Sequence, residues 1–188
     1  MPVPTPAELG PLAGLAGTWE GDQGIDISYH HDVGEIVETP YREKVELKPF
    51  GPVDNGVQQM FGLDYRMAAY KEGEDEPFHT EVGYWLWDAA TGQVMKCFMV
   101  PRGSTLIAGG DATADATSFH LHAECGSESY GVLSNKYLLD AAKVITFDMT
   151  VTIGDGEYSY DETTVYDLAR TKSRIEHTDR NTLKRVAD

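Results

Sequence analysis

Strict alternation of apolar and polar side chains is the feature that most constrains this chain. Within Lys143–Gly154, every second residue from Ile145 to Ile153 is apolar, and threonine or aspartate fills the positions between. A period of two puts these sets on opposite faces of a β-strand. The apolar set is Ile145, Phe147, Met149, Val151 and Ile153. Ser118–Cys125 repeats the pattern, so both segments predict strands with one buried and one solvated face.

Turn signals separate further segments of this kind, among them Asp54-Asn55-Gly56 and Gly154-Asp155-Gly156. We count nine or ten strands and no second long helical pattern. Short strands joined by turns form a meander, and closing the meander removes its exposed edges. The sequence therefore predicts an all-β fold. We expect a single closed antiparallel up-and-down β-barrel of about ten strands, forming one domain over residues 1–188 with a short N-terminal helix.

The expected helix covers Pro6–Leu15. Proline suits the first turn after Thr5, and leucines recur every third residue at Leu9, Leu12 and Leu15. Three glycines limit the helix to one or two turns. We expect it to act as a lid or plug.

Composition excludes several classes of partner. The formal charge of −16 opposes binding to nucleic acid, whose phosphates require Lys and Arg, and opposes docking on anionic lipid. The chain start has no basic region followed by an apolar one, so we expect no signal peptide and a cytoplasmic location. In that compartment Cys97 and Cys125 are expected to stay reduced.

Three patches resemble one known family. Gly17-Thr18-Trp19 is similar to the calycin signature, in which a basic residue, here Arg185 or Arg180, covers the Trp ring. The run Leu9–Gly21, the strand Phe78–Trp85 and the end Thr182–Val186 resemble the nitrobindin or haem-binding-like β-barrel family. The resemblance implies a ten-stranded barrel of fatty-acid-binding type. It also implies ferric haem b at the barrel mouth, nitric oxide binding and peroxynitrite isomerisation.

His177 is the axial haem ligand that this resemblance implies, since the family uses one His on its last strand. It lies one residue further from Thr182 than the family ligand does. A slip of one residue turns a side chain to the other face, unless a bulge at residues 179–181 restores it. The alternative is a surface histidine in a polar turn. The segment Gly21–Ser28 also lacks the family's Tyr-Pro-Thr element.

Other candidate site residues lie on the central strands. Phe78–Asp88 is rich in aromatic residues and predicts a strand buried on both faces. His79 and Glu81 share one face, where a structural hydrogen-bond pair is the favoured interpretation and a pocket-lining role the second. Acid–base work by His79, Glu81 and Tyr84 is a further alternative. Met99, on one strand face with Met95 and Cys97, is a candidate pocket residue and second iron ligand. Ordinary core packing is the equal alternative.

Two further candidates are polar. Arg102 would meet a haem propionate or another carboxylate, and is otherwise a turn residue. His120 and His122 have the spacing of a metal site on a strand, although a solvated strand face explains them more simply.

The sequence thus predicts a barrel that binds a small apolar or planar ligand, with haem as first choice. The alternative is a haem-free carrier of a fatty acid or other lipophile. Enzymatic activity and a homodimer are left open, and no nucleic acid or membrane partner is expected.

Overall fold

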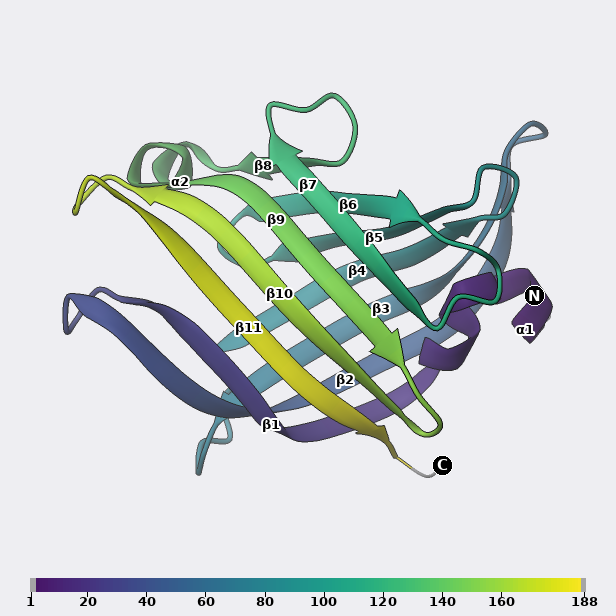
Figure 1. Cartoon of the computed structure of the whole chain (residues 1–188), viewed down its shortest axis with the longest axis horizontal. Coiled ribbons are helices and arrows are strands. Elements are labelled where there is room, and N and C mark those ends of the chain that lie inside the picture. The colour runs from purple at the N-terminus through teal and green to yellow at the C-terminus, as the bar shows by residue number, and fades with distance from the viewer. Residues whose placement is uncertain (1–2, 187–188) are drawn as a thin grey trace.

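Antiparallel strand pairing runs around almost the whole molecule and closes on itself (Figure 1). The computed structural model describes residues 3–186. Its strands are β1 (Gly17–His30), β2 (Glu35–Asp54), β3 (Gln59–Lys71), β4 (His79–Asp88), β5 (Gln93–Val100), β6 (Ser104–Asp111), β7 (Ser118–Cys125), β8 (Gly131–Ser134), β9 (Ala142–Ile153), β10 (Glu157–Leu168) and β11 (Ser173–Arg185). The predicted all-β closed barrel with a short N-terminal helix is confirmed.

The strand count and the strictly antiparallel arrangement were wrong. The described residues form eleven strands, because the four-residue β8 lies between β6 and β7. β6 and β7 pair directly only at Gly109 and His122, and β8 occupies the gap where they diverge. After β7 the chain loops back and runs parallel to it, with Glu124 opposite Gly131.

The N-terminal residues form α1 (Pro6–Leu9) and the 3₁₀ helix η1 (Gly10–Leu15), as short as expected. The three leucines are buried against the barrel core. Trp19 is also fully buried, and the Arg185 guanidinium lies 4.2 Å from its ring centroid. Arg185 also donates to the carbonyls of Gly14 and Ala16. Of the two arginines considered, Arg185 therefore covers the indole, and these elements close one barrel end.

A second helix, α2 (Lys136–Ala141), was not predicted. Asn135 caps it, accepting a hydrogen bond from the Leu138 amide at 2.9 Å. Tyr137, Leu138 and Ala141 contribute to the wall of the internal cavity at the end opposite η1. We call this end the mouth. None of the helices within residues 3–186 is long and apolar enough to cross a bilayer.

Candidate functional site

The barrel encloses a cavity of about 620 Å³, which reaches from Leu15 at the closed end to the mouth. This volume is in the range of small-molecule sites. Its deeper wall is apolar, with Leu47, Phe98, Phe147 and Val151. Its upper wall carries ionisable side chains from β1, β4, β5, β10 and β11, and Glu43 of β2 lies further inside. The site therefore combines an apolar lining with buried ionisable groups.

His177 faces into this cavity. β10 and β11 pair without interruption from Glu157 opposite Lys184 to Leu168 opposite Ser173. Every second β11 residue thus faces inward, and these are Ile175, His177, Asp179, Asn181 and Leu183. The bulge considered at residues 179–181 is absent from this pairing. The register shift lies between β1 and β11, where β1 carries an extra residue between Glu20 and Ile25.

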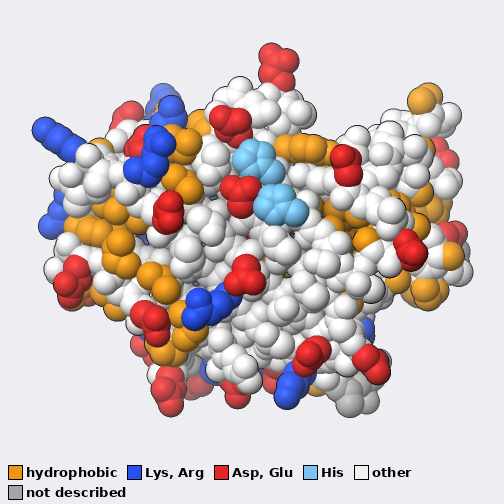
Figure 2. Space-filling view, viewed as in Figure 1, with side chains coloured by type: hydrophobic (Ala, Val, Ile, Leu, Met, Phe, Trp, Pro, Cys, Tyr) orange, Lys and Arg blue, Asp and Glu red, His pale blue; other side chains and the backbone are white. Residues whose placement is uncertain are grey.

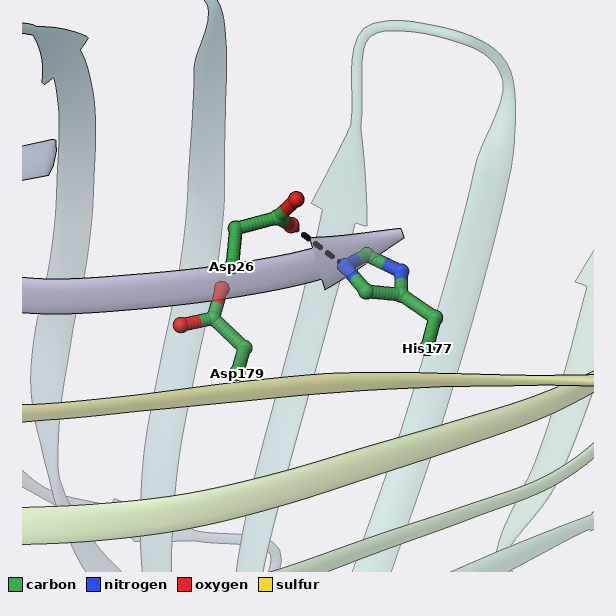
Figure 3. A group of neighbouring side chains, drawn as sticks. All are labelled: Asp26, His177 and Asp179. Carbon is green, nitrogen blue, oxygen red and sulfur yellow. Dashed lines mark hydrogen bonds and ion pairs between the residues drawn. The ribbon is translucent and has the colours of Figure 1, made fainter. Parts of the chain in front are cut away.

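Asp26 on β1 holds the His177 imidazole (Figure 3). Asp26 Oδ2 lies 2.5 Å from His177 Nε2, and Ser28 donates to Asp26 Oδ1 at 2.6 Å. Although burial opposes the charged forms, this contact raises the pKa of His177 and lowers that of Asp26. Asp179 lies beside the pair. One donor atom from each of Asp26, His177 and Asp179 lies within 4.8 Å of the others.

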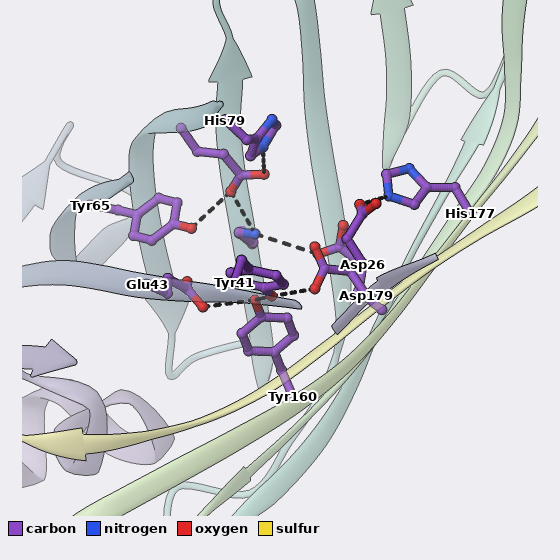
Figure 4. A network of polar contacts seen from close by, with 11 residues as sticks. Asp26, Tyr41, Glu43, Tyr65, His79, Tyr160, His177 and Asp179 are labelled. Carbon is purple, nitrogen blue, oxygen red and sulfur yellow. Dashed lines mark hydrogen bonds and ion pairs between the residues drawn. The ribbon is translucent and has the colours of Figure 1, made fainter. Parts of the chain in front are cut away.

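A chain of hydroxyl groups leads from Asp179 towards the barrel interior (Figure 4). Tyr41 donates to Asp179, the Tyr41 and Tyr160 hydroxyl oxygens lie 2.7 Å apart, and Tyr160 lies 2.9 Å from Glu43 Oε2. These three contacts need three protons, and two tyrosines supply two. A carboxyl group must carry the third. Burial raises the pKa of both end carboxyls, that of Glu43 to about 7 and that of Asp179 to about 6, so Glu43 is the one that holds the proton closer to neutral pH.

Lys96 carries a buried positive charge on the opposite wall. Its Nζ lies 2.9 Å from Glu81 Oε2 and 3.8 Å from Glu162 Oε2. Tyr65 donates to Glu81 at 2.8 Å, and His79 Nε2 lies 3.4 Å from its other oxygen. Despite burial, Lys96 lowers the pKa of Glu81, whereas burial raises that of Glu162. Glu81 is therefore the ionised partner of Lys96.

The structure separates the other predicted site residues. His79 and Arg102 line the cavity together with His177. Met99 and Tyr84 instead lie on the outer surface, 53% and 51% exposed, so the expectation that they line the pocket is corrected. β5 buries Val94, Lys96 and Phe98 on its inner face. Lys96 occupies an inward position of β5. In the sequence, its charge makes the other face, with Met99, the more apolar of the two.

The same alternation corrects the prediction for β4. Glu81, Trp85 and Trp87 point inward, while Val82 and Tyr84 are about half exposed. The strand is therefore not buried on both faces. Cys97 lies on the outer side of β5, and both cysteines are free.

His120 and His122 lie on the outside of the barrel. Both contact Asp148 Oδ1 on the neighbouring β9, at 3.2 and 2.9 Å. Figure 2 shows histidine and acidic side chains gathered over these two strands. All three side chains are exposed to solvent, and the pair stays a surface feature.

Sequence reasoning did not identify several ionisable cavity residues, among them Asp26, Glu43, Lys96 and Glu162. The sequence did contain a signal for Glu162, because Tyr158 and Tyr160 precede it at a period of two. The structure shows that both tyrosines are buried on the inner face. The others resemble solvated strand positions, and only strand parity in the closed barrel identifies them.

Comparisons with known proteins agree with this architecture. Residues 8–185 match the family described as the THAP4-like, heme-binding beta-barrel domain. A peroxynitrite isomerase of Clavibacter michiganensis subsp. michiganensis is 33% identical over 87 residues, and one of Clavibacter sepedonicus is 38% identical over 88. Each match covers 45% of this chain and only 38% of the relative's own length.

The crystal structure of Rv2717c from M. tuberculosis superposes with a TM-score of 0.66 at 20% identity. The superposition covers 97% of this chain and 99% of that one. At this identity the likeness concerns the fold. The family match spans nearly all of the chain and confirms the resemblance seen in the sequence. The chain is therefore a member of the THAP4-like, heme-binding beta-barrel domain family.

Proposed function

We propose that this protein binds ferric haem b at the barrel mouth, with His177 as the iron ligand. The observation that carries the proposal is the inward orientation of His177 on the last strand, at the wall of a cavity of about 620 Å³. Membership of a heme-binding family supports it. When bound, haem would supply an iron centre able to take a small ligand such as nitric oxide.

The donor chemistry fits this group. A neutral imidazole is a common iron ligand, and a neighbouring acceptor usually fixes its ring. Asp26 is such an acceptor, but it contacts Nε2, and within residues 3–186 no partner contacts Nδ1. Ligation through Nε2 therefore requires the imidazole to leave Asp26 and to lose any proton that Asp26 stabilises. In that arrangement Asp26 competes with iron for the imidazole, whereas ligation through Nδ1 would keep Asp26 as the acceptor that fixes the ring.

The mouth offers groups for the rest of the ligand. Phe78, Val100 and Val144 provide apolar wall, while Lys71 and Arg102 provide positive charge for propionates. Deeper in the cavity, Trp85 Nε1 is buried without a partner among the described side chains. The positive charges of Lys71 and Arg102 would locally offset the negative electrostatic field of the whole protein.

A fatty-acid carrier is the less favoured function. The cavity's buried amine, Lys96, already pairs with Glu81 at 2.9 Å. Glu43 and Glu162 line the same space and offer no positive charge that could pair with a carboxylate head group.

Titration of the purified protein with hemin tests the proposal. We expect a shifted Soret band at one haem per chain, and His177→Ala should abolish it. His79→Ala is the matched control, since His79 is also a cavity imidazole beside a carboxylate. An unshifted band, or a band lost only in His79→Ala, would refute the assignment. Saturable binding of a fluorescent fatty acid that is indifferent to His177→Ala would favour the carrier.

The name shared by the two Clavibacter relatives suggests a finer proposal. We infer that the haem-loaded protein accelerates the isomerisation of peroxynitrite. Stopped-flow decay of peroxynitrite should be faster with haem-loaded wild type than with the same protein free of haem. Equal decay rates in the two preparations would refute the proposed isomerase activity and would not bear on the proposal of haem binding.

A further inference from the structure

Three carboxylates stand side by side on adjacent strands of the upper cavity wall. Asp26 on β1 is directly opposite Asp179 on β11, and Asp179 is directly opposite Glu162 on β10. All three side chains line the cavity. Like charges directly opposite each other on a sheet are destabilising. This row therefore calls for positive charge.

The side chains within residues 3–186 supply too little positive charge to balance this row of carboxylates. His177 contacts Asp26, and Lys96 lies 3.8 Å from Glu162 but 2.9 Å from Glu81. Lys96 is thus committed first to Glu81. Glu162 receives no hydrogen bond from any side chain within residues 3–186. Because burial raises the pKa of Glu162 to about 8, Glu162 is mainly neutral near pH 7. The ionised Asp26 and Asp179 with one imidazolium then leave a surplus of one negative charge.

The geometry of the potential donors matches a metal ion. An imidazole nitrogen and two carboxylate oxygens lie within 4.8 Å of one another, so a single ion can reach all three (Figure 3). Mixed nitrogen and oxygen donors suit borderline divalent ions, whereas oxygen-only sets suit Mg²⁺ and Ca²⁺. Three protein ligands leave room for water or a small oxygen-donor ligand from the cavity.

We propose that Asp26, His177 and Asp179 form a site for one free divalent transition-metal ion, of the class of Mn²⁺, Fe²⁺, Co²⁺ or Zn²⁺. The ion would offset the surplus charge of the carboxylate row. With His177 neutral as a ligand and Glu162 protonated, the ion balances the two aspartates. Glu162 is an electrostatic neighbour in this arrangement and not one of the three ligands.

This site is independent of haem except that both would use His177. A porphyrin iron already has four equatorial nitrogens and can take only one or two protein ligands, so Asp26 and Asp179 have no role in holding it. The free ion needs all three residues. The two ligands therefore compete, and substitutions at Asp179 distinguish them.

The experiment is a Co²⁺ titration of haem-free protein, followed by calorimetry and by visible absorption of the bound ion. We expect one ion per chain and a metal-dependent rise in melting temperature. Asp179→Asn should weaken binding by at least about tenfold. It should also leave the melting temperature of the metal-free protein unchanged or higher, because it relieves repulsion and its amide oxygen still accepts from Tyr41. If Asp179 had only a structural role, Asp179→Asn would instead lower the melting temperature of the metal-free protein.

A double variant, His120→Ala with His122→Ala, is the control because it removes the surface histidine pair and should leave Co²⁺ binding unchanged. Asp26→Asn provides a second test of the site if Asp179→Asn does not fold. The proposal is overturned if folded wild type binds no Co²⁺, if binding survives in the folded site variants, or if the surface double variant loses it. Asp179→Asn should still bind haem, so failure of the haem proposal would be seen separately.

Discussion

Replacing Glu43 by glutamine should change how stability depends on pH. Glu43 is almost completely buried and contacts Tyr160 and the Asn181 amide, each at 2.9 Å. The proton count along the chain from Asp179 through Tyr41 requires a protonated carboxyl group. A glutamine amide offers an N–H and a carbonyl oxygen, as a protonated carboxyl offers an O–H and a carbonyl oxygen. The glutamine side chain should therefore mimic the neutral acid at every pH.

The magnitude follows from linkage. Burial raises the pKa of Glu43 from 4.5 to about 7 in the folded protein. The folded state then holds the proton more tightly than the unfolded state does. Its stabilising effect is fully present below the unfolded pKa and is lost as pH rises through the folded pKa. From pH 5 to pH 8.5, ionisation of Glu43 should cost the wild type about 2.5 kcal/mol relative to Glu43→Gln.

Urea unfolding at pH 5 and pH 8.5 measures this directly. From pH 5 to pH 8.5, we expect the free energy of unfolding of Glu43→Gln to rise by about 2.5 kcal/mol relative to that of the wild type. The same change corresponds to a relative gain of roughly 5–10 °C in melting temperature. Glu20→Gln is the control, since Glu20 forms an exposed ion pair with Lys44 and its effect should not vary with pH. A difference for Glu43→Gln that is the same at both pH values would refute the placement of the third proton on Glu43.

Three further substitutions test the barrel itself by urea unfolding or thermal melting. Lys96→Met should destabilise by about 3–5 kcal/mol, because it leaves the Glu81 carboxylate buried without its cation; a loss below about 1 kcal/mol would contradict the pairing. Arg185→Met should cost about 2 kcal/mol through the lost stacking on Trp19 and the lost carbonyl contacts, and Arg185→Lys should recover only part of it. Gly83→Ala should cost at least about 3 kcal/mol, since its Cβ would lie 2.0 Å from a carbonyl oxygen of the facing strand; wild-type stability would show that β4 and β5 are further apart.

Much of the barrel was predictable because strand periodicity is a local property. The alternation in Lys143–Gly154 correctly predicted that Phe147, Met149 and Val151 face the core. The short spacing of leucines in residues 6–15 predicted the N-terminal plug. The segment at β8 was not predictable, because its pairing depends on how far β6 and β7 diverge in space.

The site was predicted only in part. His177 was identified by resemblance, and its inward direction was left open because register along β11 is set by pairing with β10. Met99 and Tyr84 were assigned to the wrong face because apolar residues occupy the outer surface of β4 and β5. Lys96 occupies the inner one, against the usual preference of charged residues.

The amino-acid sequence by itself determined the strand-rich closed fold, the plug and the family, because these depend on local periodicity and on contiguous motifs. Only the tertiary structure decided which ionisable groups meet. Asp26 and His177 are 151 positions apart, and they touch because the first and last strands pair to close the barrel. Closure also removes bulk water from these groups, and their charges then have to be balanced by one another, by protons or by a ligand.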